Sequence, residues 1–165
     1  MILIDANLVG LARVQVALSM LNLNARIVSP STPMPSVPLA AAAVGCSVDQ
    51  IIKTVVFATP DGGAAIAIAN GTRRIDRRRL AIAAGVDVLR LASPEFVLDR
   101  TGYPAGGVSP IGIRDSQAPV VIDPAVLDQA TVFGGAGTEA DLLEIATAQL
   151  VTLTRACIAP IVRSD

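Results

Sequence analysis

Lys53 is the only lysine in the chain, whose other basic residues are all arginines, and the chain has no histidine. It stands at the head of the apolar run Thr54 to Phe57, whose β-branched residues predict a strand. At a strand entrance the ammonium faces either bulk water, as an ordinary surface charge, or a pocket. A compact, rotatable ammonium can hold a phosphate or an ester oxygen as a point charge, which a planar guanidinium does less readily. Lys53 is therefore the first candidate for a functional cation.

A second candidate is the segment from Thr101 to Gly112, which holds four glycines and two prolines. Glycine reaches backbone angles that are closed to other residues, and proline stiffens the chain around it. Such a loop can turn several N–H groups toward one point and hold an oxyanion or a phosphate. It is not a P-loop, because no Gly-Lys-Ser/Thr follows. The alternative is an ordered Ω-like turn that binds nothing.

A third candidate is a cluster of arginines in one short segment, where Arg73, Arg74, Arg77 and Arg78 are followed by Arg79. Such a patch can contact a phosphate backbone even on a protein whose net charge is only -1. The alternative is the solvated start of a helix. The net charge itself argues against a broad surface that binds nucleic acid without specificity.

Composition excludes several kinds of site. Without histidine there is no Ser-His-Asp or Cys-His nucleophile pair and no His-bearing zinc site, and two cysteines are too few for a four-cysteine site. We therefore expect no metal and no cofactor. Cys46 and Cys157 are expected to be free thiols in a reducing compartment. No apolar run is long enough to span a bilayer, and the start Met1 to Asp5 has no positive segment typical of export, so we expect a cytoplasmic protein.

The elements that position these candidates follow from hydrophobic periodicity and from glycine and proline punctuation. Asp76 is expected to cap a helix that ends at Gly85, and the turn 59–63 is expected to join two strands into a hairpin that Lys53 opens. The expected helices are 7–23, 38–44, 77–84, 94–100 and one within the tail 147–162, and the expected strands are 25–28, 53–58, 64–69, 88–91, 120–122, 131–133 and 142–145.

Helices and strands are interspersed without a regular βαβ repeat or a GxGxxG turn. This order favours a mixed sheet with packed helices over a doubly wound fold. No internal repeat or domain boundary is visible in the chain. We therefore expect an α+β fold that forms a single domain over residues 1–165.

The order of these motifs closely resembles the YbaK/ProRS-associated domain family. The resemblance extends from the first helix to about Leu150, and each motif is modest alone but specific in this order. The motifs that carry it are Ala40-Ala41-Ala42-Ala43-Val44-Gly45-Cys46, Lys53-Thr54-Val55-Val56-Phe57, Asp76 with its arginine-rich helix, Thr101-Gly102-Tyr103, Gly106-Gly107-Val108-Ser109-Pro110-Ile111-Gly112 and Val120-Val121-Ile122-Asp123.

The resemblance implies a partly barrel-like sheet surrounded by helices and the activity of a trans-editing aminoacyl-tRNA deacylase. Such an enzyme hydrolyses the ester of a mischarged tRNA, most often tRNA-Pro carrying Cys, Ala or another small amino acid, and can act beside prolyl-tRNA synthetase. The essential lysine of the family falls on Lys53, as a fixed positive charge for an ester or phosphate oxygen. Its GxxxP loop falls on Gly106, Gly107, Val108, Ser109 and Pro110, which are expected to bind the ester carbonyl or the terminal adenosine.

Two departures leave the substrate open. Arg26-Ile27-Val28-Ser29 stands where the cysteine-specific branch usually has a tyrosine. The acidic residue expected in the last strand falls nearest Asp141, although an ungapped alignment puts Leu142 there. Two other classes of function remain: a non-catalytic module that binds a tRNA end or a nucleotide beside a synthetase, and a scaffold in which Lys53 has no role.

Overall fold

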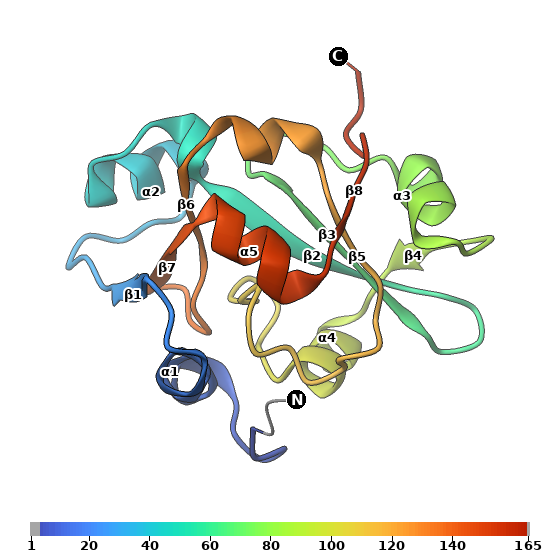
Figure 1. Ribbon diagram of the computed structural model, residues 1–165, viewed down its shortest axis with the longest axis horizontal. Coiled ribbons are helices and arrows are strands. Elements are labelled where there is room, and N and C mark those ends of the chain that lie inside the picture. The colour runs from blue at the N-terminus through green and yellow to red at the C-terminus, as the bar shows by residue number, and fades with distance from the viewer. Residues whose placement is uncertain (1–3, 165) are drawn as a thin grey trace.

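The computed structural model describes residues 4–164, so Met1 to Leu3, at the start of the chain, lie outside the described residues. It confirms the expected α+β class. Figure 1 shows the β2–β3 hairpin crossing the molecule, with α5 in front of it. The helices are α1 (Gly10–Leu21), α2 (Val37–Val44), α3 (Arg77–Ala84), α4 (Pro94–Thr101) and α5 (Thr147–Thr154), with short 3-10 helices η1 (Val48–Gln50) and η2 (Pro124–Asp128). The strands are β1 (Ala25–Val28), β2 (Ile52–Ala58), β3 (Ala64–Asn70), β4 (Arg90–Leu91), β5 (Val120–Ile122), β6 (Thr131–Gly135), β7 (Leu142–Ala146) and β8 (Cys157–Ile158).

The strands form two open sheets, and this corrects the expectation of a partly barrel-like sheet. One sheet has the order β1-β7-β6 and the other the order β4-β2-β3-β5-β8. The larger sheet is mixed, because β3 pairs antiparallel with β2 but parallel with β5. An isolated bridge between Ile51 and Phe133 links the start of β2 to β6. The described strands therefore come together at one corner without closing into a barrel.

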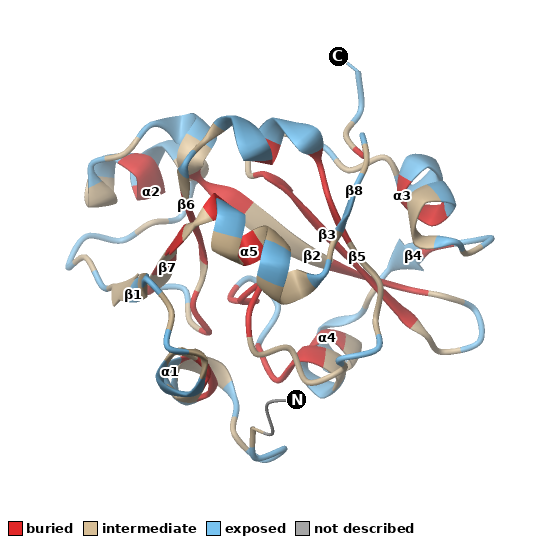
Figure 2. Ribbon diagram, in the orientation of Figure 1, coloured by how far each residue is buried: buried red, intermediate tan, exposed pale blue. Residues whose placement is uncertain are grey.

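The hairpin of β2 and β3 is the centre of the larger sheet, and its register runs from Ile52 opposite Asn70 to Ala58 opposite Ala64. Successive side chains of a strand point to opposite faces. Ile52 and Val56 accordingly pack in the larger hydrophobic cluster, while Phe57 packs against Leu80 of α3. Both faces of the sheet are thus covered, and Figure 2 shows β3 buried along its length.

Local signals set the helix ends as the sequence predicts. The Asp76 carboxylate accepts hydrogen bonds from the amides of Arg78 and Arg79, and Gly85 ends α3 with a positive φ. Ser93 caps α4 in the same way. Among residues 4–164 there is no helix of the length and apolarity that crossing a membrane requires.

A few element boundaries differ from the expectation. The strand expected over 88–91 shortens to Arg90–Leu91, because only these residues find partners on β2. The helix expected over 7–23 narrows to Gly10–Leu21, and β6 extends to Gly135 where it pairs with Leu142. The segment of η2 carries no strong helical pattern. It forms a 3-10 helix that begins after its N-cap, Asp123.

Candidate functional site

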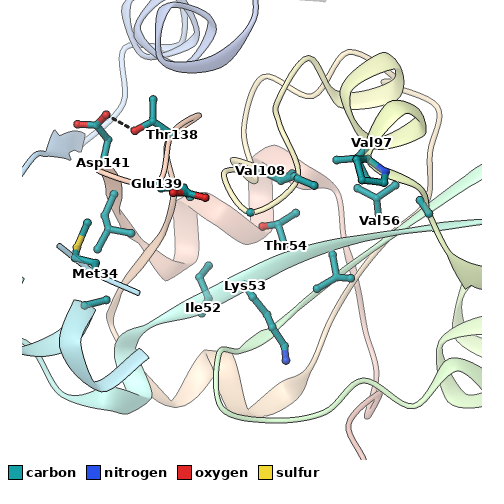
Figure 3. A pocket seen from close by; sticks show the side chains of 18 of the residues that line it. Met34, Ile52, Lys53, Thr54, Val56, Val97, Val108, Thr138, Glu139 and Asp141 are labelled. Carbon is teal, nitrogen blue, oxygen red and sulfur yellow. Dashed lines mark hydrogen bonds between the residues drawn. The ribbon is translucent and has the colours of Figure 1, made fainter. Parts of the chain in front are cut away.

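A cleft of about 510 Å³ lies between β2 and the glycine-rich loop, a size typical of small-molecule sites. Figure 3 shows Val108 of the loop facing β2, and Thr138, Glu139 and Asp141 at one end of the cleft. Most of the wall is apolar, so the few polar groups that face the cleft are the candidates for binding a ligand. The lining residues are Met34, Ala40, Ile52, Lys53, Thr54, Val55, Val56, Leu91, Ala92, Pro94, Val97, Ala105, Gly106, Val108, Gly135, Thr138, Glu139, Asp141 and Leu142.

The floor of the cleft is a stretch of the β2 edge that pairs with no other strand within residues 4–164. Strand β4 pairs only with Phe57 and Ala58, and the bridge to β6 involves Ile51. The amide of Ala92 donates to the Val56 carbonyl at 3.1 Å, which shows that Val56 directs its backbone groups toward this edge. The backbone N–H and C=O groups of successive residues point to opposite edges of a strand, so those of Thr54 point to the same edge as those of Val56. The cleft therefore receives backbone polar groups from β2.

Close backbone packing fixes the loop on the opposite wall. The amide of Gly137 donates to the Gly107 carbonyl at 2.8 Å. A Cβ on Gly135 would lie 2.2 Å from the Val108 carbonyl oxygen, and one on Gly137 would lie 2.3 Å from the carbonyl carbon of Gly10. Only glycine allows these approaches. The sequence analysis missed this second glycine cluster, although the run Gly134 to Gly137 was a visible signal for it.

The same loop is held from its other side by α1 and by its own tyrosine. Tyr103 is fully buried and donates to the Ile111 carbonyl at 2.7 Å. Burial raises the pKa of the Tyr103 phenol well above its ordinary range, so the hydroxyl remains a donor. The guanidinium of Arg13 donates to the Gly112 carbonyl at 2.5 Å. These contacts preorganise the loop.

Within the predicted loop segment the residues divide by task. Gly106 and Val108 line the cleft. The amide of Gly107 already donates to the Pro104 carbonyl at 2.9 Å. Ser109 is buried and its hydroxyl accepts from the Ile111 amide at 3.4 Å, while Pro110 has no N–H to offer. Gly106 and Val108 are thus the members of the GxxxP loop that border the cleft.

Lys53 contributes to the cleft wall, but its ammonium lies on the other side of β2. Nζ donates to the carbonyl oxygen of Arg73, and Figure 3 shows the side chain extending away from Val108. Burial lowers the pKa of Lys53 from its ordinary value, and the charge of nearby Arg74 lowers it further. Lys53 and Arg74 thus form one basic corner beside the cleft.

The members of the arginine cluster differ in what their side chains contact. Arg73 is half-buried and donates to the Arg163 carbonyl at 3.0 Å. Arg79 donates to the Val162 carbonyl at 2.9 Å, so both side chains fasten the end of the described chain. The remaining members, Arg74, Arg77 and Arg78, are exposed next to Lys53 and along the start of α3.

Asp141 lies at the far end of the cleft, just before β7, and is 8% exposed. One carboxylate oxygen accepts from the Ser29 hydroxyl and the other from the Thr138 hydroxyl. Leu142 lines the cleft beside it, so both positions considered for the acidic residue reach the same wall. The sequence analysis named neither partner. Ser29 lies 112 residues from Asp141 along the chain, and Thr138, although only three residues away, belongs to no motif that marks it as a partner.

Three comparisons bear on this site. Residues 32–153 match the model of a family described as the aminoacyl-tRNA editing domain. A proline–tRNA ligase of Pelobacter propionicus is 32% identical over 107 residues, which make up 64% of this chain and 18% of the ligase, so the chain spans less than a fifth of that relative. The Enterococcus faecalis protein EbsC, named as a candidate Cys-tRNA(Pro)/Cys-tRNA(Cys) deacylase, is 29% identical over 128 residues, 76% of each chain. A crystal structure of a candidate trans-editing enzyme for prolyl-tRNA synthetase aligns with a TM-score of 0.85 at 30% identity, covering 99% of this chain and 100% of the other.

Proposed function

The chain belongs to the aminoacyl-tRNA editing domain family, and we propose that it is a deacylase that hydrolyses mischarged tRNA in trans. The substrate we propose is tRNA-Pro carrying Cys, Ala or another small amino acid. The relationship to proline–tRNA ligases and to EbsC supports this choice. Prolyl-tRNA synthetase is the partner that the same relationship suggests.

The observation that carries the proposal is the cleft between the free edge of β2 and a loop fixed by glycine packing. In the reaction, water adds to the ester carbonyl carbon, the bond from that carbon to the ribose oxygen breaks, and the ribose oxygen takes up a proton. The products are a free amino acid and tRNA. An aminoacyl ester is already activated, so positioning and charge stabilisation are the main requirements.

The amides of Gly106 and Val108 are proposed to hold the carbonyl oxygen as it becomes negative. Both residues line the cleft. The hydrogen bond to the Pro104 carbonyl is made by the Gly107 amide and involves neither of theirs. Donors that are fixed before the reaction stabilise developing charge without reorganising. Gly107, Ser109 and Pro110 support this arrangement by holding the loop in shape.

Lys53 is proposed to bind a phosphate of the tRNA end in preference to the ester oxygen. Its Nζ lies against the Arg73 carbonyl, on the face of β2 that the ester does not occupy, and Arg74 adds a second positive charge there. Arg77 and Arg78 extend the basic surface along α3 and are proposed to contact the acceptor stem. This role agrees with a compact ammonium that acts as a point charge.

Asp141 is proposed to bind the α-ammonium group of the aminoacyl end. A buried carboxylate in a cleft is stabilised by hydroxyl donors and by a cationic ligand. The hydroxyls of Ser29 and Thr138 leave acceptor sites on both oxygens of the carboxylate. Met34, Ala40 and Leu142 line the adjoining wall, which favours a small apolar side chain on the substrate.

The test is a deacylation panel with the purified protein. Transfer RNA-Pro charged with Cys, Ala, Ser, Thr or Pro is incubated with the wild type and with Lys53→Ala, and the remaining ester is measured over time. We expect rapid loss of one or more mischarged species, with Pro retained and the variant inactive. If all mischarged esters survive while the protein shifts the tRNA in a gel, the deacylase proposal is rejected in favour of a non-catalytic binding module.

A further inference from the structure

Thr54 lines the cleft with a polar side chain that no part of the proposed function uses. Its side chain leaves β2 on the face opposite to Lys53 and points toward Val108 (Figure 3). Its Oγ1 is buried and finds no hydrogen-bond partner among residues 4–164. Building on the proposed function, we infer that Thr54 is a catalytic residue whose hydroxyl donates a hydrogen bond to the carbonyl oxygen of the bound ester.

The unpaired hydroxyl is the first step of the argument. A buried hydroxyl without a partner destabilises a protein, because it gives up its hydrogen bonds to water and gains none. The neighbours Val55 and Val56 show that valine, which has the same shape, suits this strand. A threonine at this position therefore carries a cost to stability that a ligand entering the cleft can offset.

The position of the hydroxyl is the second step. Thr54 and Val108 line facing walls of the cleft, and the backbone groups of Thr54 lie along the free edge of β2. If the carbonyl oxygen of the ester accepts a hydrogen bond from the Val108 amide, that oxygen lies beside Thr54. Rotation of the threonine between its staggered rotamers is enough to turn Oγ1 from its unpaired position toward the ligand.

Charge development is the third step. When water adds to the ester, the carbonyl oxygen becomes negative and each hydrogen bond to it strengthens. A donor that gains strength in this way lowers the barrier more than it tightens substrate binding. The inference therefore predicts an effect on kcat that exceeds the effect on KM.

The experiment compares Thr54→Val, Thr54→Ser and Thr131→Val with the wild type. The substrate is the mischarged tRNA that the wild type hydrolyses fastest. Thr131 lies in β6 outside the cleft and provides the same chemical change as a control. We expect Thr54→Val to lower kcat at least about tenfold with little change in KM, while Thr54→Ser and Thr131→Val stay within about threefold. The melting temperature of Thr54→Val should equal or exceed that of the wild type.

Two outcomes overturn the inference. The first is that Thr54→Val hydrolyses the ester as fast as an active wild type. The second is that Thr54→Ser and Thr54→Val lose the same fraction of kcat. If the wild type leaves every ester intact, the deacylase proposal fails separately. Binding of 3′-alanylamino-3′-deoxyadenosine, an amide analogue, then decides about Thr54. Weaker binding to Thr54→Val supports contact with the carbonyl, and unchanged binding rejects it.

Discussion

The ammonium of Lys53 donates a hydrogen bond to the carbonyl oxygen of Arg73, on the face of β2 opposite to the Thr54 hydroxyl. Two adjacent residues of one strand thus serve different sides of the sheet, as strand geometry requires. Thr54 faces the space for the ester, whereas Lys53 joins Arg74 at a basic corner. This division separates the proposed chemistry from the proposed binding of phosphate.

Replacing Lys53 by methionine is expected to lower kcat/KM for the mischarged tRNA by roughly 100-fold, since a charge-assisted contact of about 2–3 kcal/mol is removed. Folding should survive, because methionine fills the half-buried site and no longer requires desolvation of a charge. Deacylation rates and thermal unfolding measure the two effects. Lys53→Arg is the matched control and should recover part of the activity by keeping the charge. Full activity of Lys53→Met would contradict the proposed phosphate contact.

The pKa of Lys53 is expected below its ordinary value of 10.5, because burial and then the charge of Arg74 both disfavour the ammonium. Protein labelled with ¹³Cε-lysine gives one titrating signal, since the chain has one lysine. Arg74→Gln should raise this pKa, whereas Arg155→Gln, remote in sequence, should leave it unchanged. The unfolded chain binds the proton more tightly, so the charged lysine destabilises the fold below its folded pKa. This penalty should fade as the pH rises from the folded pKa to 10.5. A wild-type signal that titrates at 10.5 or above would refute the shift.

Gly135→Ala is expected to lower the free energy of unfolding by about 1–3 kcal/mol and to reduce deacylation, because the new methyl group meets the Val108 carbonyl and displaces the loop. Gly134→Ala is the neighbouring control. Its methyl group would lie 3.3 Å from the Ile52 side chain, which can yield. Chemical denaturation and initial rates of deacylation measure the two effects. Equal stability and equal rates for the two variants would disprove the role of close packing in holding the loop.

Asp141→Asn is expected to raise KM at least about tenfold, since the ion pair with the substrate α-ammonium is lost while the shape is kept. Glu144→Gln is the control, because that carboxylate pairs with exposed Arg26 at 3.0 Å, outside the cleft. Steady-state kinetics with free and N-acetylated aminoacyl-tRNA provide the sharper test. Acetylation removes the positive charge, so the wild type and Asp141→Asn should then differ little. A difference that persists after acetylation would assign Asp141 another role.

Arg77→Gln and Arg78→Gln are each expected to weaken tRNA binding and to reduce the slope of log K against log salt by about 0.7–0.9, as for the loss of one phosphate contact. Both side chains are exposed at the start of α3. Arg155→Gln, at the end of α5, is the control for a change in net charge. Fluorescence anisotropy across a salt series gives the slopes. Slopes that match the control would exclude α3 from the tRNA surface.

Local chemistry made most individual elements predictable from sequence. The cap at Asp76 and the turn between β2 and β3 act over a few residues, so their signals are contiguous. The same reasoning placed Lys53 at the start of a strand and marked the segment from Thr101 to Gly112 as a stiffened loop. It could not place Ser29 beside Asp141, because a hydrogen bond between segments 112 residues apart leaves no periodic pattern.

By itself, the sequence determined the type of most helices and strands, the motif order typical of the family and the residues able to carry charge. Only the tertiary structure decided which face of β2 meets the loop. It places the Thr54 side chain toward the cleft and the Lys53 ammonium on the opposite side of the strand. The physical reason is that strand alternation fixes the difference between neighbouring side chains but not their absolute direction. That direction depends on contacts between distant parts of the chain, such as the close approach of Gly135 to the Val108 carbonyl.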